Sequence, residues 1–161
     1  MNPILRRTEA KHSLHDISTY RAGITQSTAH RQLKKFTDEA LREHNLTTMQ
    51  WFILGAIHDT GRQGITITEL SKIVDTNVPY ITNTLNKLEI KGMVSREAHP
   101  KDSRIRIVRL QPAFRPSFKA IENSLRKKMR NTLYATVTPE ELRVYITVLS
   151  KLSNDLSPAD N

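Results

Sequence analysis

Residues 66–92 read TITELSKIVDTNVPYITNTLNKLEIKG, and this stretch decides the fold. Its first helix begins with a capping box, in which the Thr66 hydroxyl accepts from the amide of Glu69 and the Glu69 side chain reaches back. Residues 75–77 (Asp-Thr-Asn) favour a turn, so this helix is short. A second helix follows almost at once, and two short helices joined by a tight turn predict a helix-turn-helix.

The second helix presents two different faces. Asn77 can cap it, Pro79 is tolerated in its first turn, and Gly92 favours its end. The inner face is apolar and is formed by Ile81, Leu85 and Leu88. The residues left on the outer face are Asn77, Pro79, Tyr80, Thr82, Asn83, Asn86 and Lys87. Because an asparagine amide pairs with adenine and a lysine reaches phosphate or guanine, we expect Asn83 to contact a base and Lys87 the DNA backbone. The alternative, a merely polar surface, stays open at this point.

A β-hairpin is predicted after the second helix. Residues 93–98 and 104–110 have the composition of strands, and residues 99–103 (His-Pro-Lys-Asp-Ser) separate them. From residue 87 to 109 seven basic residues face three acidic ones, a local charge of +4. A cluster of charged residues is most often only a solvent-exposed surface. Arginines at a hairpin tip, however, suit the narrow, electronegative minor groove of DNA. We therefore expect Arg104 to enter a minor groove.

Helices on both sides of this segment make the chain mostly helical. Apolar positions follow a helical period from about residue 17 to 44, as one long helix or two abutting ones. A capping box at residues 47–50 opens a helix that should end near Gly61. A further helix is expected from about residue 116 to 133. Another capping box opens a last helix, lined with apolar residues over 138–156.

The composition restricts the classes of function. The chain has 161 residues, which suits one domain. Its net charge of +9 and pI near 10.0 favour an anionic partner, nucleic acid or an acidic membrane surface. The absence of cysteine excludes a disulfide scaffold, thiolate-bound zinc, an iron–sulfur cluster and thiol-based sensing. Because no apolar run approaches the ~18 residues of a spanning helix and none resembles a signal peptide, we expect a cytoplasmic protein.

Metal binding and catalysis have little support in the sequence. The motif His12-x-x-His15-Asp16 has plausible ligand spacing, but it lies in a terminal tail, so we predict no metal and no cofactor. The chain contains no glycine-rich phosphate loop, no Gly-x-Ser-x-Gly and no His-Glu-x-x-His. We therefore predict that the protein is not an enzyme.

The order of elements and five short motifs resemble the MarR family of bacterial transcription regulators over residues 32–156. These motifs are residues 46–54 (LTTMQWFIL), 68–74 (TELSKIV), 88–96 (LEIKGMVSR), 99–104 (HPKDSR) and 107–110 (IVRL). The Asp-x-Arg of the wing is the most specific of them, and Asp102 and Arg104 match it.

The chain also departs from the family pattern at three places. The family often has an arginine where Ser103 stands and a Thr-x-x-Gly helix start where residues 111–114 stand. At the head of the recognition helix, members commonly carry Ser or Thr followed by Thr-Arg, whereas this chain has Pro79-Tyr80 and Thr82-Asn83. A different operator preference is expected accordingly.

The resemblance implies a mainly α fold with a small β-hairpin wing, a winged helix-turn-helix flanked by N- and C-terminal dimerisation helices. A single domain, residues 1–161, would then comprise a dimerisation helix region (13–45), a DNA-binding part (46–110), C-terminal dimerisation helices (111–156) and a tail (157–161). The apolar stripes of the terminal helices exceed what a small winged domain can cover, which also predicts a homodimer. Two recognition helices related by a twofold axis would read a pseudo-palindromic operator in double-stranded DNA, with half-sites about 10 base pairs apart.

The resemblance also suggests two sets of contact residues. The wing residues expected at DNA are Lys101, Asp102, Ser103, Arg104 and Arg106. Many family members bind small aromatic acids or phenols in a crevice between the dimer helices and the winged part. The residues that could line such a crevice here are Tyr20, His30, Arg31, Trp51, His58, Phe114 and Phe118. Aromatic residues at helical spacing are more often core than pocket.

The expected function is that of a homodimeric, sequence-specific DNA-binding transcription regulator, a repressor relieved by a small aromatic or phenolic ligand. Two alternatives remain. One is a ligand-independent factor that competes with other DNA-bound proteins. The other is a winged-helix adaptor that binds proteins and does not read DNA, whose binding would show little dependence on salt.

Overall fold

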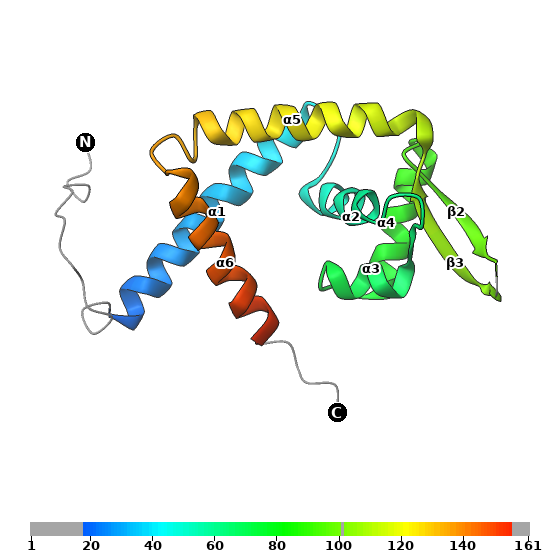
Figure 1. Cartoon of the computed structure of the whole chain (residues 1–161), viewed down its shortest axis with the longest axis horizontal. Coiled ribbons are helices and arrows are strands. Elements are labelled where there is room, and N and C mark those ends of the chain that lie inside the picture. Colours follow the sequence, from blue (N-terminus) through cyan, green and yellow to red (C-terminus); the bar gives the residue numbers. More distant parts are fainter. Residues whose placement is uncertain (1–17, 101, 156–161) are drawn as a thin grey trace.

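The computed structural model describes residues 18–100 and 102–155 of the chain. The elements are α1 (Thr19–Arg42), α2 (Thr48–Asp59), β1 (Ile65–Thr66), α3 (Ile67–Ile73), α4 (Val78–Ile90), β2 (Val94–His99), β3 (Asp102–Leu110), a 3-10 turn (Pro112–Phe114), α5 (Arg115–Asn131) and α6 (Pro139–Asp155). Figure 1 shows a lobe that contains α2, α3, α4 and the sheet, with β2 and β3 projecting from it. Helix α5 runs from this lobe to the region where α6 lies beside α1. This order confirms the predicted winged helix-turn-helix with helices on both sides.

Three predicted capping boxes fix the starts of helices. At α2, Gln50 N donates to Thr47 Oγ1 at 3.2 Å and Thr47 N donates to Gln50 Oε1 at 3.1 Å. The same reciprocal pairs open α3 and α6, between Thr66 and Glu69 and between Thr138 and Glu141. Each box satisfies two amides that would otherwise lack a partner at the helix start.

The core of the lobe lies between the helix-turn-helix and the sheet. The predicted inner face of α4 is confirmed, because Ile81, Leu85 and Leu88 have no exposed surface. They belong to one cluster with Leu70 of α3 and Val108 of β3. Full burial of such a side chain contributes about 1.5–3 kcal/mol, so this cluster holds α4 firmly with its other face outward.

The sequence did not predict the third strand of the sheet. The strand order is β1-β3-β2, and both pairs are antiparallel. Strand β1 pairs Ile65 with Val108 of β3. Gly64 precedes it with φ +73°, and a Cβ at this position would lie 2.6 Å from the Ile107 side chain, so only glycine allows this close approach.

The hairpin is tighter than the sequence predicted. His99 belongs to β2, and Asp102 and Ser103 belong to β3, so the expected loop at residues 99–103 is wrong. The reason is the pairing of His99 with Asp102, which continues the ladder beyond an irregularity at Ala98. Strand β3 is therefore longer than expected, β2 is shifted by one residue toward the tip, and the pairing extends close to the tip.

Helix α5 also differs from its prediction at one end. It stops at Asn131, and Leu133 lies beyond it, because Thr132 has a non-helical backbone (φ −121°, ψ −77°). Arg130 Nη1 donates to Val137 O at 2.7 Å and closes the turn toward α6. Helix α1 is continuous, which settles the choice between one helix and two. The predictions for residues 1–17, Lys101 and residues 156–161 lie outside the described residues.

Candidate nucleic-acid interface

Helix α4 presents the predicted outer residues to solvent. Six of the seven are exposed and Thr82 is half-buried. Asn77 is committed to the helix start, because its Oδ1 accepts from Tyr80 N at 2.9 Å. Thr82 Oγ1 donates to Val78 O within the helix. The side chains of Asn83 and Asn86, three residues apart, lie on one face and remain toward solvent.

The wing places its predicted residues at the end of the hairpin. Asp102 Oδ1 accepts the backbone N–H of Arg104 at 2.9 Å. Arg104 and Arg106 are exposed. Among residues 18–100 and 102–155, no hydrogen bond or ion pair engages the Arg104 guanidinium. It can therefore reach a ligand without first breaking a contact in the chain.

Several basic residues of the predicted reading surface are engaged within the protein. Arg96 of β2 pairs with Glu89 of α4, and Arg109 of β3 pairs with Glu97 of β2 at 2.6 Å. These ion pairs brace the hairpin against α4 and one strand against the other. The local charge counted from the sequence thus overstates the free positive charge.

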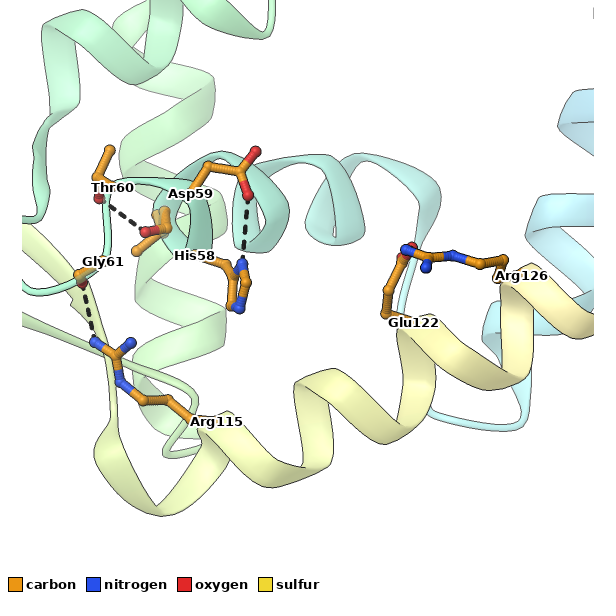
Figure 2. A network of polar contacts seen from close by, with 8 residues as sticks. His58, Asp59, Thr60, Gly61, Arg115, Glu122 and Arg126 are labelled. Carbon is orange, nitrogen blue, oxygen red and sulfur yellow. Dashed lines mark hydrogen bonds and ion pairs between the residues drawn. The ribbon is translucent and has the colours of Figure 1, made fainter. Parts of the chain in front are cut away.

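A further group of basic residues, Arg126, Lys128 and Arg130 on α5, is engaged within the protein as well. Arg126 donates to Glu122 at 2.8 Å, one turn away on the same helix (Figure 2). Lys128 pairs with Glu43 at the end of α1 at 2.7 Å and lowers the pKa of that carboxyl through a hydrogen bond and its charge. Arg130 donates to the backbone oxygens of Tyr134 and Val137 in the turn beyond α5. Lys128 thus joins α5 to the end of α1, and Arg130 closes the turn after α5.

Three of the predicted ligand residues form an aromatic stack. The ring of Phe118 on α5 lies 4.7 Å from Trp51 and 4.5 Å from His58, both on α2. Phe118 is 4% exposed and belongs to the core, and half-buried Phe114 packs against the same core. Figure 2 shows His58 at the end of α2, where Nδ1 lies 3.3 Å from Asp59 Oδ1, and Arg115 donating to Gly61 O. This stack joins α5 to α2.

The other predicted ligand residues lie elsewhere. His30 borders a crevice of about 460 Å³ between α1, the start of α2 and Tyr80 of α4. Arg31 is exposed and donates to Thr28 of its own helix, and Tyr20 is exposed near the start of α1. The predicted set is therefore divided among a packed aromatic cluster, a crevice and a helix surface.

The crevice beside His30 includes polar residues that the sequence reasoning missed. Asp38 of α1 accepts from Lys34 at 2.6 Å and from the Thr48 hydroxyl of α2 at 2.5 Å. These two hydrogen bonds hold the pKa of Asp38 below its usual value. The i,i+4 spacing of Lys34 and Asp38 was a signal in the sequence, whereas the contact with Thr48 depends on how α1 and α2 cross.

The described residues show neither a metal centre nor a membrane-spanning helix. Residues 18–100 and 102–155 contain no group of three or more side chains suited to hold a metal ion. The predicted tail motif with His12 and His15 lies outside this part of the chain. Among the described helices, none has the length and apolar character needed to cross a membrane.

Comparisons with known proteins agree with this geometry. Residues 44–105 match the sequence profile of the MarR family. A protein of Bacillus subtilis (strain 168), named "Uncharacterized HTH-type transcriptional regulator YdgJ", is 38% identical over 95 residues. That match covers 58% of this chain, which spans only about half (56%) of the relative's length.

The fold is also that of solved MarR-family structures. A mutant of MarR from E. coli, solved in complex with operator DNA, is 21% identical, has a TM-score of 0.71 and matches 84% of this chain and 99% of its own. The S. aureus MepR–DNA complex is 24% identical, has a TM-score of 0.67 and matches 87% of this chain and all of its own. At this identity the likeness concerns the fold, which has the same mainly helical plan with a small antiparallel sheet. Through its winged helix-turn-helix segment, residues 44–105, the chain is similar to the MarR family.

Proposed function

We propose that this protein is a non-enzymatic transcription regulator that binds double-stranded DNA, with α4 in the major groove and the β2–β3 hairpin at a minor groove. Two exposed features of the same chain carry the proposal. One is the polar face of α4, with Asn83 at its centre, and the other is the wing residue Arg104. An α-helix fits the major groove, and arginine suits a narrow minor groove. The complexes of MarR and MepR with DNA, on the same fold, support this reading.

The proposed DNA contacts are those named from the sequence. On α4, Asn83 contacts a base, Lys87 contacts phosphate, and the remaining outer residues flank them. In the wing, Arg104 enters the minor groove and Arg106 approaches the backbone. Lys101 and Ser103 keep their sequence-based assignment to the wing. The net charge of +9 favours all of these contacts.

The proposed active form is a homodimer. The first part of α1 and most of α6 are exposed in one chain, and they carry large apolar side chains, among them Ile24 (62% exposed) and Ile146 (51% exposed). A helix of this kind is marginal in water without a packing partner. A second copy that covers these faces would set two α4 helices about one DNA turn apart, the spacing of a pseudo-palindromic operator.

The proposed regulation is repression that a small aromatic or phenolic ligand relieves. The crevice of about 460 Å³ has the size of a small-molecule site. Phe52 and Met49 supply apolar walls, His30 supplies a polar group, and the Lys34 ammonium, which gives one N–H to Asp38, has further donors for a ligand oxygen. Tyr80 of α4 borders the same crevice, so a ligand there would act directly on the proposed reading helix.

Selection from a random duplex library tests the proposal. The purified protein should enrich two inverted half-sites about 10 base pairs apart, and protection of both should appear in a footprint. Salicylate-like carboxylates should raise the melting temperature of the protein and release it from the selected site. Enrichment without a ligand effect would favour a ligand-independent regulator. Failure to enrich any sequence would contradict DNA reading.

A further inference from the structure

The two asparagines on the outer face of α4 differ in what their amides can offer. Both are exposed, and their spacing of three residues places them on the side opposite the buried Ile81 and Leu85. In the part of the chain that the structure describes, the Asn83 side chain has no hydrogen-bond partner. Its oxygen and its NH2 group are therefore both available.

The oxygen of Asn86 is held toward Arg96. Arg96 of β2 donates from Nη2 to Asn86 Oδ1 at 2.7 Å. A guanidinium has only donors, so the amide must turn its oxygen, and not its nitrogen, toward Arg96. The group that Asn86 presents away from Arg96 is therefore its NH2, which donates hydrogen bonds.

Arg96 is itself held by α4. Its Nε donates to Glu89 Oε2 at 3.1 Å, and its Nη2 bonds the same carboxylate oxygen. The Arg96 side chain is only 22% exposed. Charge-assisted hydrogen bonds of this kind are stronger than neutral ones, so the guanidinium is fixed between Asn86 and Glu89. A wing strand thus sets the orientation of an amide on the reading helix.

We propose that Asn86 is a specificity-determining residue that acts only as a donor and selects guanine over adenine at the base pair it faces. The inference rests on the proposed function, DNA reading by α4. Guanine presents two acceptors in the major groove, N7 and O6. Adenine presents an acceptor beside a donor, and its bidentate pairing with asparagine needs the amide oxygen turned toward the base, whereas Arg96 holds that oxygen toward β2. Asn83, with both groups available, is suited to adenine.

A panel of duplexes tests this inference, with every base pair of the selected operator permuted and the Kd measured for each. The base pair that loses its preference in Asn86→Ala, and not in the control Asn83→Ala, is the one that Asn86 reads. There the wild type should bind guanine about tenfold more tightly than adenine. Arg96→Met removes the guanidinium, frees the amide oxygen and should move the preference to adenine.

Circular dichroism would reveal whether Arg96→Met folds. A second variant tests the inference independently of that outcome. Asn86→Asp retains an acceptor for Arg96 and removes the NH2, so the preference should move to cytosine, whose major-groove edge presents a donor. A wild-type preference for adenine at this base pair overturns the inference. So does an unchanged preference in folded Arg96→Met, or guanine retained by Asn86→Asp. A wild type that enriches no sequence at all overturns the proposed function together with this inference.

Discussion

Asp102 Oδ1 accepts the backbone N–H of Arg104 at 2.9 Å, so the carboxylate shapes the wing tip through the main chain. A bond between an aspartate and the amide two residues on is an Asx turn, which fixes the local path of the chain. Among the described residues, the Arg104 guanidinium makes no hydrogen bond or ion pair. The aspartate thus positions the arginine without competing with DNA for its charge.

This relationship predicts different effects for two changes at one position. Asp102→Ala removes the acceptor and should weaken binding to the selected operator. Asp102→Asn keeps an acceptor oxygen and removes a negative charge near phosphate, so it should bind at least as tightly as the wild type. Arg104→Ala should show the largest loss, about 1–3 kcal/mol. Fluorescence anisotropy of a labelled duplex measures all three, and equal weakening in the Asn and Ala variants would contradict the Asx-turn role.

The aromatic stack should behave as core. Phe118→Ala removes a ring that is 4% exposed and stacks on Trp51 and His58, so it should lower the free energy of unfolding by about 3–5 kcal/mol. Urea denaturation followed by circular dichroism measures this loss. Ile90→Ala is the control, because Ile90 is 87% exposed and its replacement should change stability by less than about 0.5 kcal/mol. Similar small losses in both variants would argue that the stack is not a packed part of the lobe.

The exposed face of α6 should mediate dimerisation. Ile146→Glu places a charge on a side chain that is 51% exposed in one chain and would be covered by a second copy. Analytical ultracentrifugation should give the wild type twice the 18.5 kDa of one chain and give this variant a single copy. Thr147→Glu adds the same charge at the neighbouring, exposed position and should remain dimeric. A monomeric wild type would refute the proposed assembly.

The contact between α1 and α2 should weaken in acid. Hydrogen bonds from Lys34 and Thr48 lower the pKa of Asp38 below 3.8. A lowered carboxyl pKa in the folded state stabilises the protein fully above the unfolded pKa, and this contribution is lost as the pH falls through the folded pKa. The stability difference between the wild type and Asp38→Asn should therefore be constant at neutral pH and shrink below about pH 4. Urea midpoints of both proteins from pH 7 to pH 3 check this. A stability difference that does not change with pH would show that it does not come from the ionised Asp38 carboxylate.

Local signals in the sequence predicted most of the fold. The capping residues Thr47, Thr66 and Thr138 each marked a helix start correctly, because a capping box acts over four residues and needs no tertiary contact. The inner and outer faces of α4 followed from the spacing of apolar residues. Strand β1 was missed because two residues carry no alternation, and Thr66 serves both as strand and as helix cap.

In the candidate site, too, local features could be predicted from the sequence and contacts between elements could not. The outward position of Asn83 could be predicted from the helical period, but the engagement of the Asn86 oxygen could not. That contact joins residues on α4 and β2, and it depends on the angle between hairpin and helix. Of the aromatic residues suggested by family resemblance, Trp51, His58 and Phe118 meet in a packed stack, whereas Tyr20 lies apart near the start of α1. Which residues meet across elements depends on tertiary packing, which no local pattern contains.

The most direct measurement of the central claim is a mobility-shift titration with the DNA upstream of the protein's own coding sequence, against unrelated DNA as competitor, at two salt concentrations. The account predicts a specific complex whose affinity falls as salt rises, with a log–log slope of about −0.9 for each phosphate contact, and falls again in Arg104→Ala. A specific complex of undiminished affinity in Arg104→Ala would contradict the role of the wing. Equal affinity for both DNAs, or no complex at either salt concentration, would contradict sequence-specific DNA binding.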